Sequence, residues 1–262
     1  MRGLILKCGA WFLALAMVTS LQSRAQDVQV MSSGGFAAAY KLLGAQFEKA
    51  TGRQLATAWG PSMGTTSGAI PVRLARGESA DVVIMVRAAL DDLVKKGLVE
   101  EGSVVDLAGS RIAMAVKAGA PAPNIGTMDA FRKALLKAKS VAYSDSASGV
   151  YIQNELFKKM GIEEEMKAKS KMIPAEPVGE VVARGDAQIG FQQLSELKPI
   201  KGITIVGPIP EQVQSITMFS AGIVKNGPHQ RAGRQLIQFL ASPDACQMIR
   251  ETGLDPVTCA RN

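Results

Sequence analysis

Residues 60–85 read GPSMGTTSGAIPVRLARGESADVVIM, a glycine-rich turn that leads into a helix and then into an apolar strand. The pattern predicts the helix over 69–76 and the strand over 82–85. The first turn of a helix leaves backbone N–H groups without partners and carries partial positive charge. Ser67 adds a hydroxyl, and Gly68 lets a ligand approach the backbone closely. The stretch therefore predicts an anion site, and an ordinary N-cap and loop is the alternative for one such turn alone.

Two other turns have the same design. SSGG at 32–35 follows a predicted strand and opens a helix that ends near Gly52, and SDSASGVY at 144–151 opens a helix that runs to about Met160. Strands that alternate with helices along the chain predict an α/β protein of parallel sheets covered by helices. Ligands bind beyond the carboxyl ends of such strands, so we expect the three turns to share one site.

The N-terminus has the composition of a secretory signal peptide. Arg2 and Lys7 precede an apolar run over 8–18, and small residues lead to a cleavage site near Ala25-Gln26. Residues 1–25 are therefore predicted to direct export to the periplasm and to be removed, leaving no membrane insertion. A retained membrane anchor is the weaker alternative, because the apolar run is short for a bilayer.

Composition narrows the class of ligand. Removing three basic residues and no acid with the signal peptide lowers the formal net charge from +7 to +4. The basic residues are spread without interleaved aromatics, which argues against nucleic acid and favours a small anion. Cys246 and Cys259 either form a disulfide after export or remain two separate thiols. No CxxC, metal-ligand cluster or GxGxxG spacing is present, so no metal and no cofactor is predicted.

The order of these motifs resembles the periplasmic molybdate-type substrate-binding proteins. The likeness extends from SSGG, QFEKATG and ADVVIM through SASGVY and AEPVGEVV to LASPDACQMIRETG. It implies a two-lobed type 2 periplasmic-binding-protein fold, in which each lobe is a sheet flanked by helices and two crossover strands join the lobes. One lobe is expected over 26–108 plus 217–262 and the other over 109–216, with crossovers near 112–116 and 215–220.

The same resemblance implies a set of substrate-binding positions. They are Ser33, Gly35, Ser67, Gly68, Ser148, the amide of Val178, and Gln193 in place of the family's tyrosine. Arg87 stands where the family has an acid, and a guanidinium suits a planar carboxylate bidentately. An organic anion is therefore expected in preference to molybdate, with Arg87 as its clamp and Arg73 and Lys117 as weaker candidates.

The whole chain is also similar to the bacterial aconitate isomerases, exported enzymes that resemble these binding proteins. That likeness implies conversion between cis- and trans-aconitate by moving one proton across three carbons. The alternative is a receptor that delivers a tricarboxylate or another small anion to the permease of an ABC transporter. Both functions need the cleft, but only the enzyme needs a positioned acid–base group.

Two residues are the candidates for proton transfer. Tyr151 follows the 144–149 turn by one helical step, although a core aromatic is its alternative. Glu176 lies beside the Val178 position and could act as a desolvated base, or it could be a surface acid. His229, the only histidine, and Asp145, a plausible helix cap, are less favoured.

Overall fold

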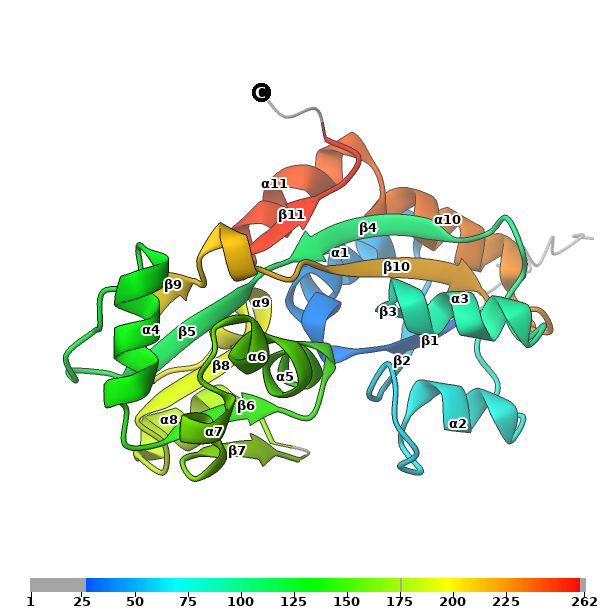
Figure 1. The fold of residues 1–262 in the computed structure, drawn as a ribbon. Coiled ribbons are helices and arrows are strands. Elements are labelled where there is room, and N and C mark those ends of the chain that lie inside the picture. The colour runs from blue at the N-terminus through cyan, green and yellow to red at the C-terminus, as the bar shows by residue number, and fades with distance from the viewer. Residues whose placement is uncertain (1–26, 175, 260–262) are drawn as a thin grey trace, which may run out of the picture.

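The computed structural model describes residues 27–174 and 176–259 and shows two lobes side by side (Figure 1). Lobe 1 is built on a six-stranded sheet in the order β11-β4-β10-β3-β1-β2. Its strands are β1 (Val28–Ser32), β2 (Leu55–Trp59), β3 (Val82–Val86), β4 (Val105–Ser110), β10 (Thr217–Ile223) and β11 (Leu254–Pro256). Its helices are η1 (Gly34–Phe36), α1 (Ala37–Thr51), α2 (Ile70–Ala75), α3 (Arg87–Lys95), α10 (Gln230–Leu240), η4 (Pro243–Ala245) and α11 (Cys246–Glu251).

Lobe 2 is built on a five-stranded sheet in the order β7-β6-β8-β5-β9. Its strands are β5 (Ile112–Lys117), β6 (Val141–Ser144), β7 (Ser170–Ile173), β8 (Ile189–Gln193) and β9 (Ile203–Pro208). Its helices are α4 (Met128–Lys137), α5 (Ala147–Tyr151), the π-helix η2 (Ile152–Leu156), α6 (Phe157–Lys159), α7 (Glu163–Lys167), α8 (Val178–Arg184), α9 (Leu194–Leu197) and η3 (Glu211–Val213). The predicted two-lobed α/β fold is confirmed.

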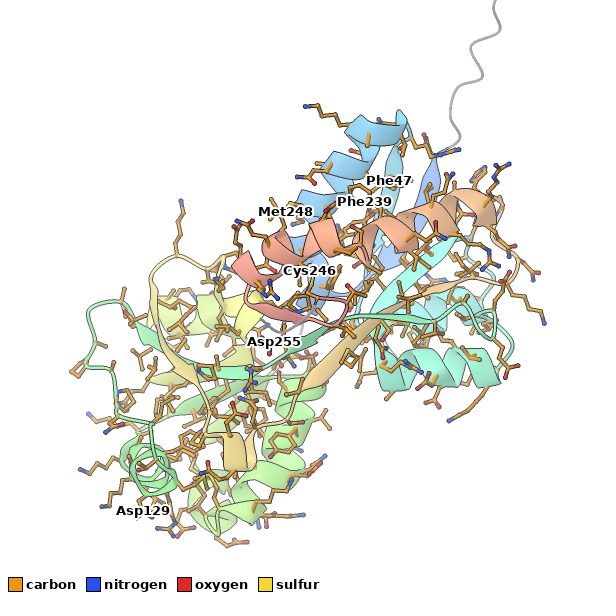
Figure 2. The ribbon with its side chains drawn as sticks, turned by 90° about the horizontal axis from the view of Figure 1, so that it is seen from above. Phe47, Asp129, Phe239, Cys246, Met248 and Asp255 are labelled. Atoms are coloured by element: carbon orange, nitrogen blue, oxygen red, sulfur yellow. A yellow bond between two sulfur atoms is a disulfide. The ribbon has the colours of Figure 1, made fainter. Side chains whose placement is uncertain are left out.

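Helical periodicity packs α1 against the sheet of lobe 1. Tyr40, Leu43 and Phe47 recur at helical spacing and are all buried in the core of that lobe. Gly52 ends the helix in the left-handed conformation, with φ of 69°. Figure 2 shows Phe47 beside Phe239 of α10, in an edge-to-face contact with ring centroids 5.7 Å apart. These contacts hold α1 against the core of lobe 1 and against α10.

Both sheets are mixed, which corrects the prediction of parallel sheets. β10 pairs antiparallel with β3 and β4, and β5 pairs antiparallel with β8 and β9. These are the two strands by which the chain enters a lobe from the other lobe, and they run against the strands of the local strand–helix units. β1, β2 and β3 in lobe 1 and β6, β7 and β8 in lobe 2 remain parallel, so their carboxyl ends still share an edge.

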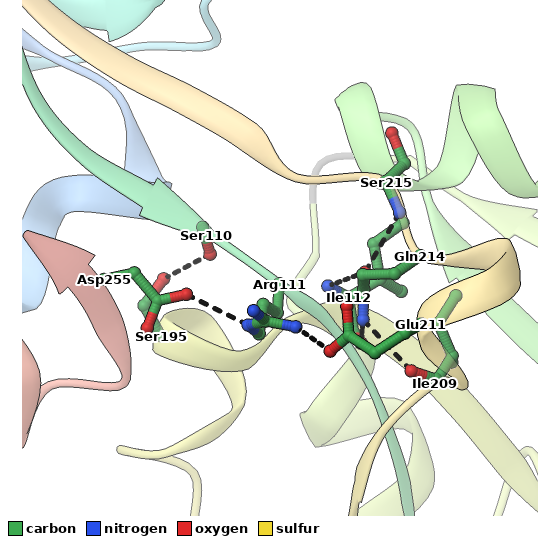
Figure 3. Close-up of polar contacts among 9 residues, drawn as sticks. All are labelled: Ser110, Arg111, Ile112, Ser195, Ile209, Glu211, Gln214, Ser215 and Asp255. Carbon is green, nitrogen blue, oxygen red and sulfur yellow. Dashed lines mark hydrogen bonds and ion pairs between the residues drawn. The ribbon is translucent and has the colours of Figure 1, made fainter. Parts of the chain in front are cut away.

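Figure 3 shows where the chain passes between the lobes. β4 ends and β5 begins on either side of Arg111, so we propose this residue as the first boundary. Its Nε donates to Asp255 Oδ2 of lobe 1 at 3.0 Å, and its Nη1 pairs with Glu211 of lobe 2. On the return passage, the Gln214 side chain accepts the Ile112 amide at 2.8 Å. Polar contacts therefore fix both passages at one place.

A disulfide joins Cys246 to Cys259 and ties α11 to the segment after β11. Of the two alternatives for these cysteines, the bonded one is confirmed. The predicted signal peptide, 1–25, lies outside the described residues. Within the described chain, the helices are too short or too polar to cross a membrane.

Candidate functional site

A cleft of about 480 Å³ lies between the lobes and is lined by both. Lobe 1 contributes residues 33–35, Ala37, Lys41, 59–64, Thr66, Val86 and Phe219. Lobe 2 contributes 144–147, Glu176, Pro177, Gln192, Gln193 and Glu196. Most of these segments follow the carboxyl ends of the parallel strands, so the predicted convergence of the turns is observed.

The turn after β1 lines the cleft with the backbone of Gly34 and Gly35. The first hydrogen bond inside η1 runs from Ala37 N to Gly34 O, so the amides of residues 34–36 precede it. The Ser33 amide donates to Ile84 O at 2.9 Å and fixes the turn on the end of the sheet. A Cβ on Gly35 would overlap the ring of Phe219. Any side chain at position 35 would therefore displace the Phe219 ring, which favours glycine here.

The loop after β2 lines the cleft with its first half only. The amides of Ala69 and Ile70 donate to Thr66 O and Pro61 O, both at 3.0 Å, so the loop itself satisfies the start of α2. Ser67 and Gly68 are not among the lining residues. The expected anion trap at the start of α2 is therefore replaced by a ligand-facing loop over 60–66.

Ser62 anchors this loop to the neighbouring strand. Its Oγ accepts the amide of Val86, the last residue of β3, at 3.0 Å. Both residues line the cleft.

The turn after β6 brings Asp145 and Ser146 into the cleft, but Ser148 lies beneath it. Ser148 is fully buried, and its Oγ lies 3.1 Å from Ser144 Oγ. A Cβ on Gly149 would overlap the carbonyl of Ser144, so only glycine fits this tight turn. Ser148 therefore supports the lining and does not form part of it.

The two glutamines at the end of β8 have different tasks. Gln192 Oε1 accepts the Val178 amide at 2.9 Å, so the amide that we expected to contact the ligand already has a partner. Gln193 donates from Nε2 to Thr217 Oγ1 at 2.8 Å, while its Oε1 is buried without a hydrogen-bond partner. Gln193 keeps the place in the cleft that was predicted for it.

Lys41 is the one cationic side chain that the described chain places in the lining. It is exposed on α1, and its Nζ lies 5.3 Å from the centroid of the Trp59 ring at the end of β2. No sequence motif marks it as a site residue. The sequence does place Lys41 one helical turn after Ala37, on the same face of α1, and this spacing could have indicated that Lys41 faces the cleft.

The predicted arginine clamp is held elsewhere. Arg87 donates from Nε to Asp91 Oδ1 at 2.8 Å and from Nη1 to Asp106 Oδ1 at 2.7 Å, and it is not among the lining residues. The hydrogen bond to Asp106 is the main reason that its pKa is raised. Arg73, paired with Glu78, and Lys117 also lie outside the lining. The structure thus places Arg87 in an ion-pair network beside the cleft.

Neither predicted proton carrier has the surroundings that its role requires. The Tyr151 hydroxyl is buried and donates to Val213 O at 2.8 Å, and the residue is not in the lining. Glu176 lines the cleft at its exposed edge, and its Oε1 accepts from Arg184 Nη1 at 2.6 Å. That hydrogen bond lowers the pKa of Glu176, which is the reverse of a desolvated base. His229 is bound to Asp81, outside the lining.

Glu196 is the carboxyl group that the sequence analysis missed. It lies on α9, directly after β8, and its Oε2 is buried with no hydrogen-bond partner in the described chain. Burial raises its pKa to about 7, although hydrogen bonds from the Gln192 side chain and the Gln193 backbone oppose that effect. A glutamate three residues beyond a predicted ligand position was the only signal in the sequence.

Unpartnered polar atoms gather in this cleft. Of the four buried side-chain atoms in the described residues that lack a hydrogen-bond partner, three belong to Ser33, Gln193 and Glu196. Buried polar groups are nearly always paired, so this concentration marks a site that receives a polar ligand. No group of His, Cys, Asp or Glu suited to a metal ion occurs within the described ranges.

Known proteins match this chain along almost its whole length. Residues 28–255 match the family model described as bacterial extracellular solute-binding protein. An aconitate isomerase from Pseudomonas sp is 53% identical over 252 residues, covering 96% of each chain. The molybdate-binding protein ModA of Azotobacter vinelandii is 28% identical over 264 residues, covering 95% of this chain and 96% of that one. The solved structure of the Azotobacter vinelandii periplasmic molybdate-binding protein aligns with a TM-score of 0.68 at 19% identity, covering 87% of this chain and 98% of that one.

Proposed function

This chain belongs to the bacterial extracellular solute-binding protein family, and within it we propose that it is an aconitate isomerase, which interconverts cis- and trans-aconitate. The observation that carries the proposal is the identity of more than half of its residues with an aconitate isomerase along both full lengths. We place the protein in the periplasm, exported by residues 1–25, in keeping with the extracellular family.

The positive side of the cleft suits the substrate. Aconitate carries three carboxylates, and anions are stabilised by free amides at the start of a helix and by ammonium groups. The backbone of Gly34 and Gly35, at the start of η1, and the Lys41 ammonium belong to the same wall. Ser33 and Gln193 add polar atoms without other partners. We assign substrate binding to these groups, and a supporting role to Ser148 and Val178.

The reaction is an allylic proton shift. A base removes a proton from the methylene beside one carboxylate, and the electron pair spreads over the allylic system and its carboxylates. The proton then returns at the other end, and the double bond has moved across the central carbon. The intermediate is more negative than the substrate, so fixed donors that face it lower the barrier. No oxidant, reductant or second substrate is consumed.

The alternative function is a receptor that delivers a small anion to an ABC permease. The family description and the molybdate-binding relative favour it, since those proteins bind solutes. A receptor needs the donor wall of the cleft, but it has no use for a basic carboxyl group beside an anion.

One experiment separates the two functions. Purified protein lacking residues 1–25 is mixed with trans-aconitate in D₂O and followed by proton NMR. We expect the cis isomer to appear and deuterium to enter the substrate methylene. If calorimetry shows binding while the spectrum stays unchanged, the receptor function is correct and the isomerase proposal is wrong.

A further inference from the structure

We propose that Glu196 is the acid–base residue of this cleft, which takes the proton from the substrate methylene and returns it to the far carbon. The inference rests on the proposed function and deepens it. It moves the proton-transfer role from the edge of the cleft to its buried floor, at the junction of the two lobes.

The position of Glu196 is fixed from both lobes. α9 follows β8 of lobe 2 without a loop and packs against η1 and α1 of lobe 1 (Figure 1). The neighbouring Ser195 is buried, and its Oγ donates to Gly35 O at 2.7 Å. A Cβ on Gly34 would lie 2.6 Å from Glu196 Oε1. The carboxyl group therefore lies beside Gly34, in the turn that is assigned to the substrate.

Glu196 is also free to accept a proton. No lysine, arginine or histidine of the described residues forms an ion pair with it, and its Oε2 is buried without a partner. Glu176, by contrast, is neutralised by Arg184. The other charged residues of the lining are Lys41 on α1 and Asp145 after β6, and Asp145 contributes to raising the pKa of Glu196. A carboxyl group that titrates near neutrality is matched to general base catalysis.

The proposed step balances on this one side chain. The carboxylate of Glu196 takes the methylene proton, so one C–H bond breaks and one O–H bond forms. The proton of that O–H bond can exchange with solvent, and the O–H bond then breaks as a C–H bond forms at the other end of the allylic system. The glutamate returns to its starting state after each turnover, and no co-reactant is needed.

Glu196→Gln tests the assignment, because it keeps the shape of the side chain and removes the proton acceptor. We expect kcat to fall by about 10²–10⁴, the usual contribution of general acid–base catalysis. The Kd for aconitate should change less than about threefold. That is well below the tenfold change in Kd that corresponds to about 1.4 kcal/mol of binding free energy. Deuterium exchange at the substrate methylene should disappear with the turnover. A purely structural role would not separate binding from exchange in this way.

Three further variants make the outcome unambiguous. Glu180→Gln, on the exposed side of α8, is the matched control and should keep full activity. Glu176→Gln should lose less than Glu196→Gln, and the reverse order would overturn the proposal. Glu196→Asp, which shortens the reach but keeps a carboxyl group, should retain measurable exchange. If Glu196→Gln unfolds, an Asp variant with full wild-type kcat would equally overturn it.

Failure of this inference can be told from failure of the proposed function. If the wild-type protein leaves aconitate unchanged, both fall together. If the wild type is active and Glu196→Gln keeps exchange within tenfold of it, only the assignment of Glu196 is wrong. The wild-type rate should also rise with pH through about 7, as the carboxyl group loses its proton.

Discussion

The two walls of the cleft have opposite chemistry although both are turns at the carboxyl ends of parallel strands. Lobe 1 presents amides, hydroxyls and the ammonium of Lys41, whereas lobe 2 presents three carboxyl groups, Asp145, Glu176 and Glu196. A receptor for an anion gains from donors on both walls, and carboxylates facing the ligand oppose binding. The difference indicates a division of labour, in which lobe 1, with Gln193 of lobe 2, binds the substrate and a carboxyl group of lobe 2 performs the proton transfer.

The acidic wall can face an anion because its charge is reduced. Glu176 is paired with Arg184, and Glu196 is protonated over a wider pH range than an ordinary glutamate. Glu176 is neutralised by an ion pair and Glu196 by protonation, so the wall is not a uniformly negative surface.

The largest expected effect concerns the acidic wall and the stability of the fold. The pKa of Glu196 is about 7 when folded, against an ordinary value of 4.5, so the folded protein holds this proton more tightly than the unfolded chain. Ionising Glu196 therefore lowers the free energy of unfolding of the wild type. The loss is absent below the ordinary pKa, grows between the two pKa values, and reaches about 3 kcal/mol above pH 7. Glu196→Gln removes the titrating group.

We expect Glu196→Gln to become more stable relative to the wild type by about 3 kcal/mol between pH 4 and pH 8.5, measured by urea unfolding at both values. Glu180→Gln should show no such pH-dependent gain. A stability difference that stays constant with pH would mean that Glu196 is ionised normally, and the contrast between the walls would weaken.

The second effect concerns the basic wall. Lys41→Ala removes the one cation among the described lining residues, and we expect KM for aconitate to rise about tenfold, or 1.4 kcal/mol. kcat should change much less, because the acid–base group lies on the other wall. Lys49→Ala, exposed near the end of the same helix, is the control. If Lys41→Ala lowers kcat and leaves KM unchanged, the division between binding and chemistry is wrong.

The third effect concerns the place where the walls touch. Gly34→Ala puts a methyl group 2.6 Å from Glu196 Oε1, and the flexible carboxyl group must move away. We expect kcat to fall about fivefold, or about 1 kcal/mol in the barrier, with little loss of stability. Gly68→Ala is the matched control, since nothing lies within 4 Å of its new methyl group. Equal activity of the two variants would show that Glu196 does not need its observed position.

The sequence predicts the basic wall better than the acidic wall, for a physical reason. Glycine-rich turns between strands and helices are visible as local patterns, and they predicted a shared site at the strand ends. The family resemblance implied the two lobes and the places of Ser33, Gly35 and Gln193, all three of which line the cleft. α9 has only four residues and no periodicity, so Glu196 was not assigned to an element. Strand β4, VDLAGS, lacks clear alternation and was missed as well.

Roles that depend on distant partners were the other failure. Tyr151 looked available in sequence, but its hydroxyl is taken by Val213, 62 positions later. The Val178 amide is taken by Gln192. Such pairs form only when the fold brings the partners together, so local pattern does not reveal them. A charge four residues away on the same helix, such as Asp91 from Arg87, is the exception that sequence could have shown.

The smallest expected effect defines where the basic wall ends. Arg87 is about 40% exposed and is already paired with Asp91 and Asp106, and exposed ion pairs contribute little to stability. We expect Arg87→Ala to lower the free energy of unfolding by less than about 1 kcal/mol and to leave aconitate affinity within about twofold, measured by calorimetry beside Lys41→Ala. A tenfold loss of affinity would mean that the substrate draws Arg87 away from its carboxylates. The basic wall would then extend past the end of β3, and Arg87 would regain the clamping role that the sequence suggests.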